Sequence, residues 1–204
     1  MNMKTMLTFL GVTIGILVGV GALLWQFGSA TAKPLSDVAG DMRLKQGEGN
    51  VVVVEFSDFQ CPACAAVHAP LKQVLAKYAG KVAYVHRHYP LTSIHKNALS
   101  AAHATEAAYN QGKFFEYGDV LFTKQAEWEG LADPSEKYIT YAKELGMDMS
   151  KFETDLNSRE VADRVSADMV YANRHALSGT PTFFVNGVQV DFTNLETKLA
   201  ELTK

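Results

Sequence analysis

The chain has 204 residues, of which 48% are apolar and 20% charged, and its formal net charge is −3. This is the balance of an ordinary globular domain, with enough apolar material for one core. The charge is close to neutral and forms no basic stripe, which argues against nucleic acid as a partner.

The first 32 residues differ in composition from the rest. No charged residue occurs from Thr5 to Ala32, and residues 6–27 form a long apolar stretch. About 20 apolar residues span a bilayer, whereas a signal-peptide core has about 7–15. We therefore predict a transmembrane helix over residues 1–32 that acts as a signal-anchor. A signal segment removed at Ala30-Thr31-Ala32 is the alternative, and either one places the rest of the chain outside the cytoplasm.

Residues 28–50 are polar and rich in small side chains, and they show no clear apolar period. We interpret residues 33–49 as a linker and residues 50–204 as the folded domain.

The domain begins with a pattern of strand, helix and strand. The run VVVVEF at 51–56 predicts a buried strand, and the segment after the cysteines predicts a helix that is kinked at Pro70 and ends at Gly80. Alternation over residues 81–91 predicts a second strand.

Helical patterns then follow one another from residue 95 to about 177, with Pro134 and Ser158 as expected helix starts. Residues 182–190 read as a hairpin around Asn186-Gly187, and an amphipathic helix closes the chain. The order predicts an α/β domain, a small mixed sheet interrupted by a helical insertion.

The only two cysteines, Cys61 and Cys64, form a CxxC pair. Haem attachment requires His after the second cysteine, where Ala65 stands. A structural zinc needs two more ligands, for which His86 and His88 are the candidates. A structural disulfide across two residues would restrain little chain, because stabilisation grows with loop length.

A redox-active pair accounts for the position of the cysteines best. The valine strand leads to Cys61 as an N-cap, with Pro62 at the first helical position. Free N–H groups and the helix dipole there favour a thiolate, so we expect a lowered pKa for an exposed Cys61. Cys64 lies one turn further on, less exposed and able to attack a mixed disulfide.

Four motifs in order resemble the DsbA-like branch of the thioredoxin superfamily, and in particular its membrane-tethered bacterial disulfide-bond proteins. They are FSDFQCPAC, RHYPL, QGKFFEY and GTPTFFVNG. The resemblance covers about residues 48–204. It implies a thioredoxin fold with a helical insertion over residues 92–177.

The resemblance also implies roles for particular residues. Cys61 would be the nucleophile and Cys64 the resolving thiol. Thr180-Pro181 would be the cis-proline loop, packed against the pair and offering backbone groups to a substrate. Glu55 matches a buried acidic position and would accept the proton of Cys64.

The sequence departs from the strong oxidants of this family between the cysteines. Those proteins often carry His there, whereas this chain has Pro62-Ala63. Without an imidazolium, we expect Cys61 to be less acidic than in the strongest oxidant and the couple to be more reducing.

These features predict an extracytoplasmic protein thiol–disulfide oxidoreductase without metal or other cofactor. Its partners would be cysteine-containing exported proteins and a membrane redox protein that recycles the pair. A disulfide reductase or isomerase is the alternative within this class. A thioredoxin-like metallochaperone or chaperone with an idle pair is the alternative outside it.

Overall fold

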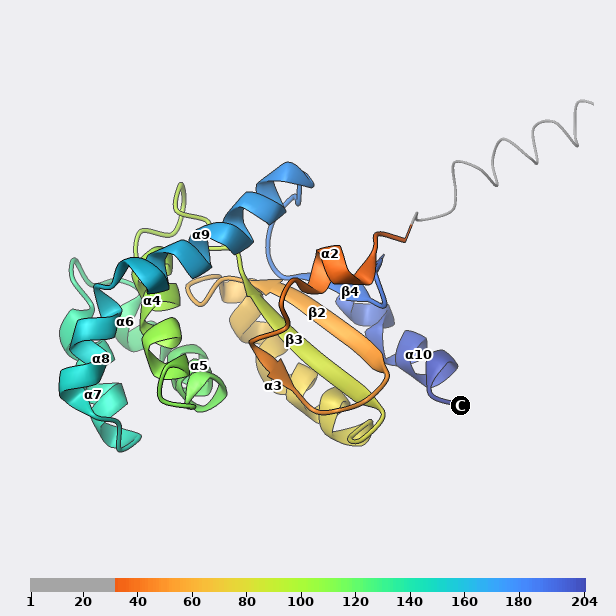
Figure 1. Cartoon of the computed structure of the whole chain (residues 1–204), viewed down its shortest axis with the longest axis horizontal. Helices are drawn as coiled ribbons and strands as arrows, with labels where there is room; N and C mark the ends of the chain where they lie inside the picture. The colour runs from red at the N-terminus through yellow and green to blue at the C-terminus, as the bar shows by residue number, and fades with distance from the viewer. Residues whose placement is uncertain (1–31) are drawn as a thin grey trace, which may run out of the picture. The chain divides into compact units, whose positions relative to one another are not determined.

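The computed structural model describes residues 32–204, and a five-stranded mixed sheet forms its centre (Figure 1). The strand order is β1-β3-β2-β4-β5. The strands are β1 (Lys45–Gln46), β2 (Val51–Ser57), β3 (Val82–His88), β4 (Thr182–Val185) and β5 (Val188–Val190). β2 and β3 are parallel, and the other neighbours are antiparallel. The predicted strand–helix–strand unit and hairpin are thus confirmed.

Two helices cover one face of the sheet, α3 (Pro62–Lys77) and α10 (Phe192–Leu202). Successive side chains of a strand point to opposite faces, so Val51 and Val53 of β2 face these helices. They pack there against Leu71 of α3 and Leu195 of α10. The predicted kink at Pro70 does not interrupt α3.

The other face of the sheet packs against α9 (Arg159–Arg174) and α2 (Leu35–Ala39). Val54 and Phe56 of β2 point to this side, and the Phe56 ring stacks on Tyr171 with centroids 5.4 Å apart. At the start of α9 the Val161 N–H donates to Ser158 Oγ at 3.2 Å, which confirms Ser158 as the N-cap.

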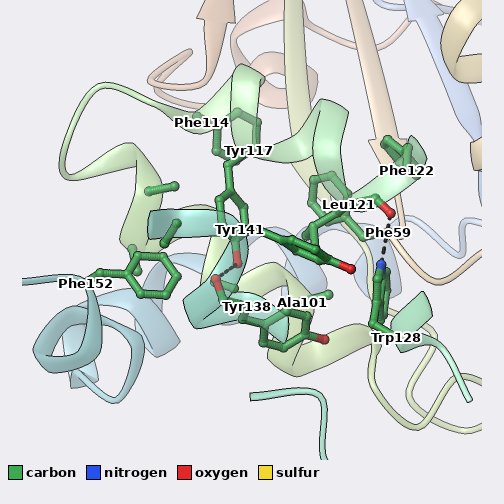
Figure 2. Packing of buried hydrophobic residues seen from close by; sticks show 14 of the residues in the cluster. Phe59, Ala101, Phe114, Tyr117, Leu121, Phe122, Trp128, Tyr138, Tyr141 and Phe152 are labelled. Atoms are coloured by element: carbon green, nitrogen blue, oxygen red, sulfur yellow. Dashed lines mark hydrogen bonds between the residues drawn. The ribbon is translucent and has the colours of Figure 1, made fainter. Parts of the chain in front are cut away.

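The helical insertion between β3 and β4 builds most of a second core (Figure 2), which also includes Leu44, Phe59, Cys61 and Cys64. Its further helices are α4 (Ala98–Tyr109), α5 (Phe114–Thr123), α6 (Gln125–Trp128), α7 (Ser135–Glu144) and α8 (Met149–Leu156). Tyr117 and Trp128 are fully buried there, and their polar atoms donate to the carbonyls of Tyr138 and Leu121 at 3.0 Å. All these helices, and α9, lie within the predicted range 92–177.

The linker prediction for residues 33–49 is wrong for two segments of that range. Residues 35–39 form α2, and residues 45–46 form an edge strand paired with β3. Leu35, Val38, Ala39 and Met42 recur at helical spacing, and the middle two are buried against the sheet. The sequence analysis missed this short apolar period, so the folded domain begins well before residue 50.

The predicted hairpin turn occurs at Asn186-Gly187, where both residues have positive φ, 47° and 84°. This is the conformation for which the Asn-Gly pair is preferred. A Cβ on Gly187 would lie 2.0 Å from the Lys33 carbonyl oxygen, so glycine also permits a close backbone approach.

The predicted membrane segment falls almost entirely on residues 1–31, outside the described part of the chain. Over residues 32–204, the helices are too short or too polar to cross a bilayer.

Candidate functional site

The two cysteines lie at the start of α3, the helix that follows β2 in the chain. Cys61 is the N-cap residue of α3, with extended backbone angles (φ −72°, ψ 122°), and Pro62 is the first helical residue, as predicted. Cys61 retains 6% of its surface and Cys64 none. The prediction of an exposed Cys61 is therefore correct only in the order of exposure of the two cysteines. It is the more accessible of the two thiols, but most of its surface is covered.

Its surroundings stabilise the anionic form of Cys61. The hydrogen bond from the Cys64 thiol is the largest cause, and together with the Thr180 side chain and the N–H groups of Cys64 and Ala63 it lowers the Cys61 pKa to about 5, against the opposing effect of burial. Helix-start N–H groups thus contribute as expected from the sequence, but a neighbouring thiol contributes more.

Cys64 has the opposite properties. Burial raises its pKa well above the ordinary value, and the hydrogen bond to Cys61 and the charge of Glu55 raise it further. Near neutral pH, Cys61 is therefore a thiolate and Cys64 a thiol. This gives the pair one ready nucleophile and one sulfur that keeps its proton.

The loop before β4 lies beside Cys61. The Thr180–Pro181 peptide bond is cis, which confirms the implied cis-proline, and the Cys61 Sγ lies 3.5 Å from the Thr180 carbonyl oxygen. β4 begins at Thr182 and pairs with β2 through Thr182↔Phe56, five residues before Cys61. Sheet pairing therefore brings these distant parts of the chain together.

Glu55 lies on the α3 side of β2 and is 4% exposed. Burial raises its pKa above the ordinary value, although the Tyr84 hydroxyl donates to Glu55 Oε2 at 2.5 Å and opposes the shift. Charge coupling to Cys61 and Cys64 places the carboxyl within electrostatic range of the pair. Tyr84 is a site residue that the sequence analysis missed, because nothing local shows which strand neighbour will meet a buried acid.

Side-chain amides tie the segment that precedes the cysteines to the insertion. Gln125 Nε2 donates to the carbonyls of Phe59 at 2.8 Å and Cys61 at 3.3 Å, and it is itself 9% exposed. Gln60 Oε1 accepts from the Asn97 N–H at 2.6 Å. The insertion therefore fixes the backbone on which Cys61 stands, a role that no local sequence signal shows.

Asp58 ties the same segment to the loop after β3. Its carboxylate accepts from the N–H groups of Gln60 at 2.7 Å and Leu91 at 2.9 Å, and it lies 2.7 Å from His95 Nδ1. The Asp58 carbonyl also accepts from the Cys61 N–H at 3.0 Å. Three residues before Cys61, this buried side chain is a second positioning group that the sequence analysis missed.

Pro62 and Ala63, between the cysteines, are both exposed. The side chain of Ala63 brings no charge to the thiolate, as the sequence analysis noted. Its backbone N–H still contributes to the lowered Cys61 pKa.

The histidines considered as zinc ligands are buried on β3. His86 stacks on Phe59 with centroids 5.2 Å apart, and His88 Nε2 lies 2.9 Å from Glu106 Oε1. Burial lowers the His86 pKa well below its ordinary value, so this ring is neutral. Over residues 32–204, His, Cys, Asp and Glu nowhere gather in threes or more in a metal-binding arrangement.

A thioredoxin-like fold with a cysteine pair of unequal acidity beside a cis-proline defines the class of thiol–disulfide oxidoreductases. The family model described as thioredoxin matches residues 39–202. The chain therefore belongs to the thioredoxin family, and its fold is that of the DsbA-like branch.

Several solved structures are similar to this chain over most of their length. A thioredoxin-like oxidoreductase from Silicibacter pomeroyi has 25% identity and a TM-score of 0.67, with 81% of this chain and 95% of that chain covered. BdbD from Bacillus subtilis has 20% identity and a TM-score of 0.73, with 86% and 98% covered. The thiol-disulfide exchange protein α-DsbA2 from Wolbachia pipientis has 21% identity and a TM-score of 0.69, with 82% of this chain and 90% of that chain covered.

The similar curated proteins are longer. The Na⁺/H⁺ antiporter NhaA 3 of Salinispora tropica is 41% identical over 140 residues, which are 69% of this chain and 21% of that protein. The antiporter NhaA of Herminiimonas arsenicoxydans is 38% identical over 140 residues, which are again 69% of this chain and 21% of that protein. The chain thus spans about a fifth of the length of the curated relatives it matches.

Proposed function

We propose that this protein is an extracytoplasmic thiol–disulfide oxidoreductase that oxidises dithiols of exported proteins. One observation carries the proposal, namely that Cys61 ionises near pH 5 while the neighbouring Cys64 stays protonated. Dithiol–disulfide exchange needs this difference, because a stable thiolate is both a nucleophile and a good leaving group.

The reaction starts from the Cys61–Cys64 disulfide. A substrate thiolate attacks Cys61 Sγ, a substrate–Cys61 disulfide forms, the Cys61–Cys64 bond breaks, and Cys64 takes up one proton. A second substrate thiolate then attacks the substrate sulfur of the mixed disulfide, and Cys61 leaves as a thiolate. Two electrons pass from the substrate dithiol to the pair. In the reverse sense, Cys64 attacks the mixed disulfide and resolves it.

Glu55 is the proposed proton donor and acceptor for Cys64. Its raised pKa means that the carboxyl holds a proton at higher pH than an exposed glutamate does. It can therefore supply the proton that Cys64 needs as a leaving group and take it back when Cys64 becomes a nucleophile.

The Thr180–Pro181 loop is the proposed substrate platform. The Thr180 carbonyl already lies 3.5 Å from the Cys61 sulfur, so an extended peptide on this loop would place its own cysteine next to Cys61. Pro62 and Ala63, which follow Cys61 in the chain, are exposed and could also contact such a peptide.

The proposed location is the outer side of a membrane, with residues 1–32 as anchor or, alternatively, as a removed signal. The uncharged stretch from Thr5 to Ala32 supports this placement. We further propose that a membrane redox protein reoxidises the pair, since two electrons remain on it after each turnover.

The test is the oxidation of a peptide with two cysteines by the purified oxidised protein, with Cys61→Ser and Cys64→Ala as variants. We expect wild type to form the peptide disulfide, Cys61→Ser to be inactive, and Cys64→Ala to accumulate a mixed disulfide when started from a Cys61 adduct. A chaperone with an idle pair would keep its function after the Cys61→Ser substitution. If this variant is as active as wild type, the proposal is overturned. Measuring the reduction potential then separates an oxidase from a reductase or isomerase.

A further inference from the structure

We propose that Asp58 and His95 act together as a clamp on the backbone turn that carries Cys61, and that this clamp sets how readily the Cys61 sulfur forms and leaves a mixed disulfide. Both are positioning residues, since they act through the backbone and not on the substrate. This role rests on the proposed function, because the mixed disulfide belongs to it.

Asp58 holds two consecutive N–H groups of the turn between β2 and α3. Its main-chain carbonyl accepts from the Cys61 N–H at 3.0 Å, and its Oδ1 accepts from the Gln60 N–H at 2.7 Å. A carboxylate that bonds the backbone two residues further on forms an Asx turn, which replaces part of a backbone turn. One residue therefore fixes the path of the chain as far as the backbone of Cys61.

The second carboxylate oxygen of Asp58 reaches the loop that follows β3. Oδ2 accepts from the Leu91 N–H at 2.9 Å and lies 2.7 Å from His95 Nδ1. The last register pair of the parallel strands β2 and β3 is Ser57↔His88. The turn and the loop therefore leave the sheet side by side, and Asp58 joins them.

His95 completes the set of donors around the Asp58 carboxylate. A carboxylate only accepts, so His95 Nδ1 carries the hydrogen of this pair. The Asp58 side chain is 0% exposed and that of His95 is 16% exposed. Because a buried carboxylate without its donors is costly, loss of the His95 donor should displace Asp58 rather than leave it in place. The two residues therefore act as a unit.

A second connection between the same segments does not depend on Asp58. The N–H of Asn97, the cap residue of α4, donates to Gln60 Oε1 at 2.6 Å. Gln60 Nε2 in turn donates to the Glu129 carbonyl at 2.9 Å. The segment before Cys61 should therefore keep its place in the fold when the clamp is removed, while the turn itself loosens.

The turn affects the sulfur because backbone groups stabilise the anion. Cys61 is the N-cap of α3, with φ −72° and ψ 122°, and the side chain of an N-cap faces the N–H groups at the second and third helical positions. Here these belong to Ala63 and Cys64, and both lower the Cys61 pKa. Such hydrogen bonds are directional. A loosened turn would therefore weaken them without changing any group that touches the sulfur.

The experiment follows the ultraviolet absorbance of the Cys61 thiolate against pH in the reduced full chain. The variants are Asp58→Asn and His95→Leu, with His95→Asn as a rescue. Asparagine at position 58 keeps the shape of the side chain but offers one acceptor oxygen where the carboxylate has two. Asparagine at position 95 keeps a donor close to the place of Nδ1. Unfolding in urea is measured alongside.

Two controls repeat these changes at exposed sites. Asp133→Asn alters a similar Asx turn, in which Asp133 Oδ1 accepts from the Ser135 N–H at 2.9 Å. His175→Leu removes a ring whose Nε2 lies 3.4 Å from Asp37 Oδ2, a carboxylate that is 46% exposed. Both controls should keep the wild-type Cys61 pKa.

Asp58→Asn should raise the Cys61 pKa from about 5 by about one unit, which corresponds to the loss of one hydrogen bond to the thiolate. The equilibrium with glutathione should then favour the Cys61–Cys64 disulfide about tenfold more. The sign separates positioning from charge, because removal of a nearby negative charge would by itself lower a thiol pKa. His95→Leu should shift the pKa in the same direction but less, and His95→Asn should restore it.

An unchanged or lowered Cys61 pKa in Asp58→Asn overturns the clamp, even if the variant is less stable in urea, because a purely structural residue would give that result. If Asp58→Asn does not fold, His95→Leu decides, and a wild-type pKa there overturns the clamp. Equal shifts in the two controls also overturn it. If wild type oxidises no dithiol peptide although the variants shift the Cys61 pKa, the proposed function fails and the clamp stands.

Discussion

The Cys61 sulfur lies 3.5 Å from the carbonyl oxygen of Thr180, a residue 119 positions further along the chain. Antiparallel pairing of β2 with β4 brings the two together, and the Thr180–Pro181 bond is cis. The thiolate therefore lies beside a backbone acceptor on one side and a helix start on the other, which gives the site an asymmetric environment that a free cysteine pair lacks.

Cys64→Ala should raise the Cys61 pKa from about 5 toward its ordinary value. The hydrogen bond from the Cys64 thiol is the largest cause of the lowered pKa, and alanine cannot donate it. The ultraviolet absorbance of the thiolate, followed against pH in the reduced protein, measures the effect. Cys61→Ser serves as the control and should show no thiolate at neutral pH. An unchanged midpoint in Cys64→Ala would contradict the assignment.

Ala63→His should lower the Cys61 pKa further and make the couple more oxidising. An imidazolium between the cysteines adds a positive charge near the thiolate, and each unit of pKa corresponds to about 1.4 kcal/mol in favour of the reduced form. Equilibration with glutathione measures the change. Ala66→His places the same ring on an exposed position of α3 and should have a much smaller effect. Equal effects of the two variants would argue against a local cause.

Glu55→Gln should stabilise the protein at neutral pH. Because the Glu55 pKa is raised by burial, the folded state binds more protons than the unfolded state between the ordinary value of 4.5 and the raised one. Folding stability therefore falls as pH rises through that window, and the penalty persists above it. The glutamine variant should lose this slope, which urea unfolding on either side of the window would show. A slope that survives the substitution would mean that another group is responsible.

Gln125→Leu should destabilise the protein by about 1–3 kcal/mol and raise the Cys61 pKa. The substitution leaves the Phe59 carbonyl without this donor and loosens the backbone that carries Cys61. Denaturant unfolding and thiolate titration measure the two effects. Gln189→Leu, at an exposed position of β5, is the matched control and should change neither. A loss of stability without a change in the Cys61 pKa would limit Gln125 to a packing role.

Arg43→Leu should also destabilise the protein by about 1–3 kcal/mol. Arg43 lies in the segment that the sequence analysis interpreted as a linker, where a substitution would leave the stability unchanged. Arg43 Nη1 lies 2.6 Å from Glu106 Oε1, and the Glu106 side chain is 0% exposed, so the change leaves a buried charge with fewer partners. Lys45→Leu, whose partner Glu48 is exposed, should cost little. Unfolding in urea compares the two, and equal stabilities would mean that Arg43 contributes no more than an exposed ion pair does.

The sequence by itself determined the order of the elements from β2 onward and the position of the cysteine pair. A run of four valines, an Asn-Gly turn and a proline after Cys61 act on the residues next to them, so their effects can be predicted without knowing the rest of the chain. The structure places β2, the β4–β5 hairpin and the start of α3 where these signals indicate.

Only the tertiary structure decided which distant groups surround the sulfur atoms. The hydrogen bond of Tyr84 to Glu55, the donation of Gln125 to Cys61 and the packing of Val38 on the sheet join residues that are remote in sequence. Such contacts depend on sheet register and on how the insertion lies against the sheet, which local periodicity does not encode. The acidity of Cys61 depends on both, because the helix start predicts that its pKa is lowered, and the hydrogen bond from the buried Cys64 thiol is the largest single cause of that lowering.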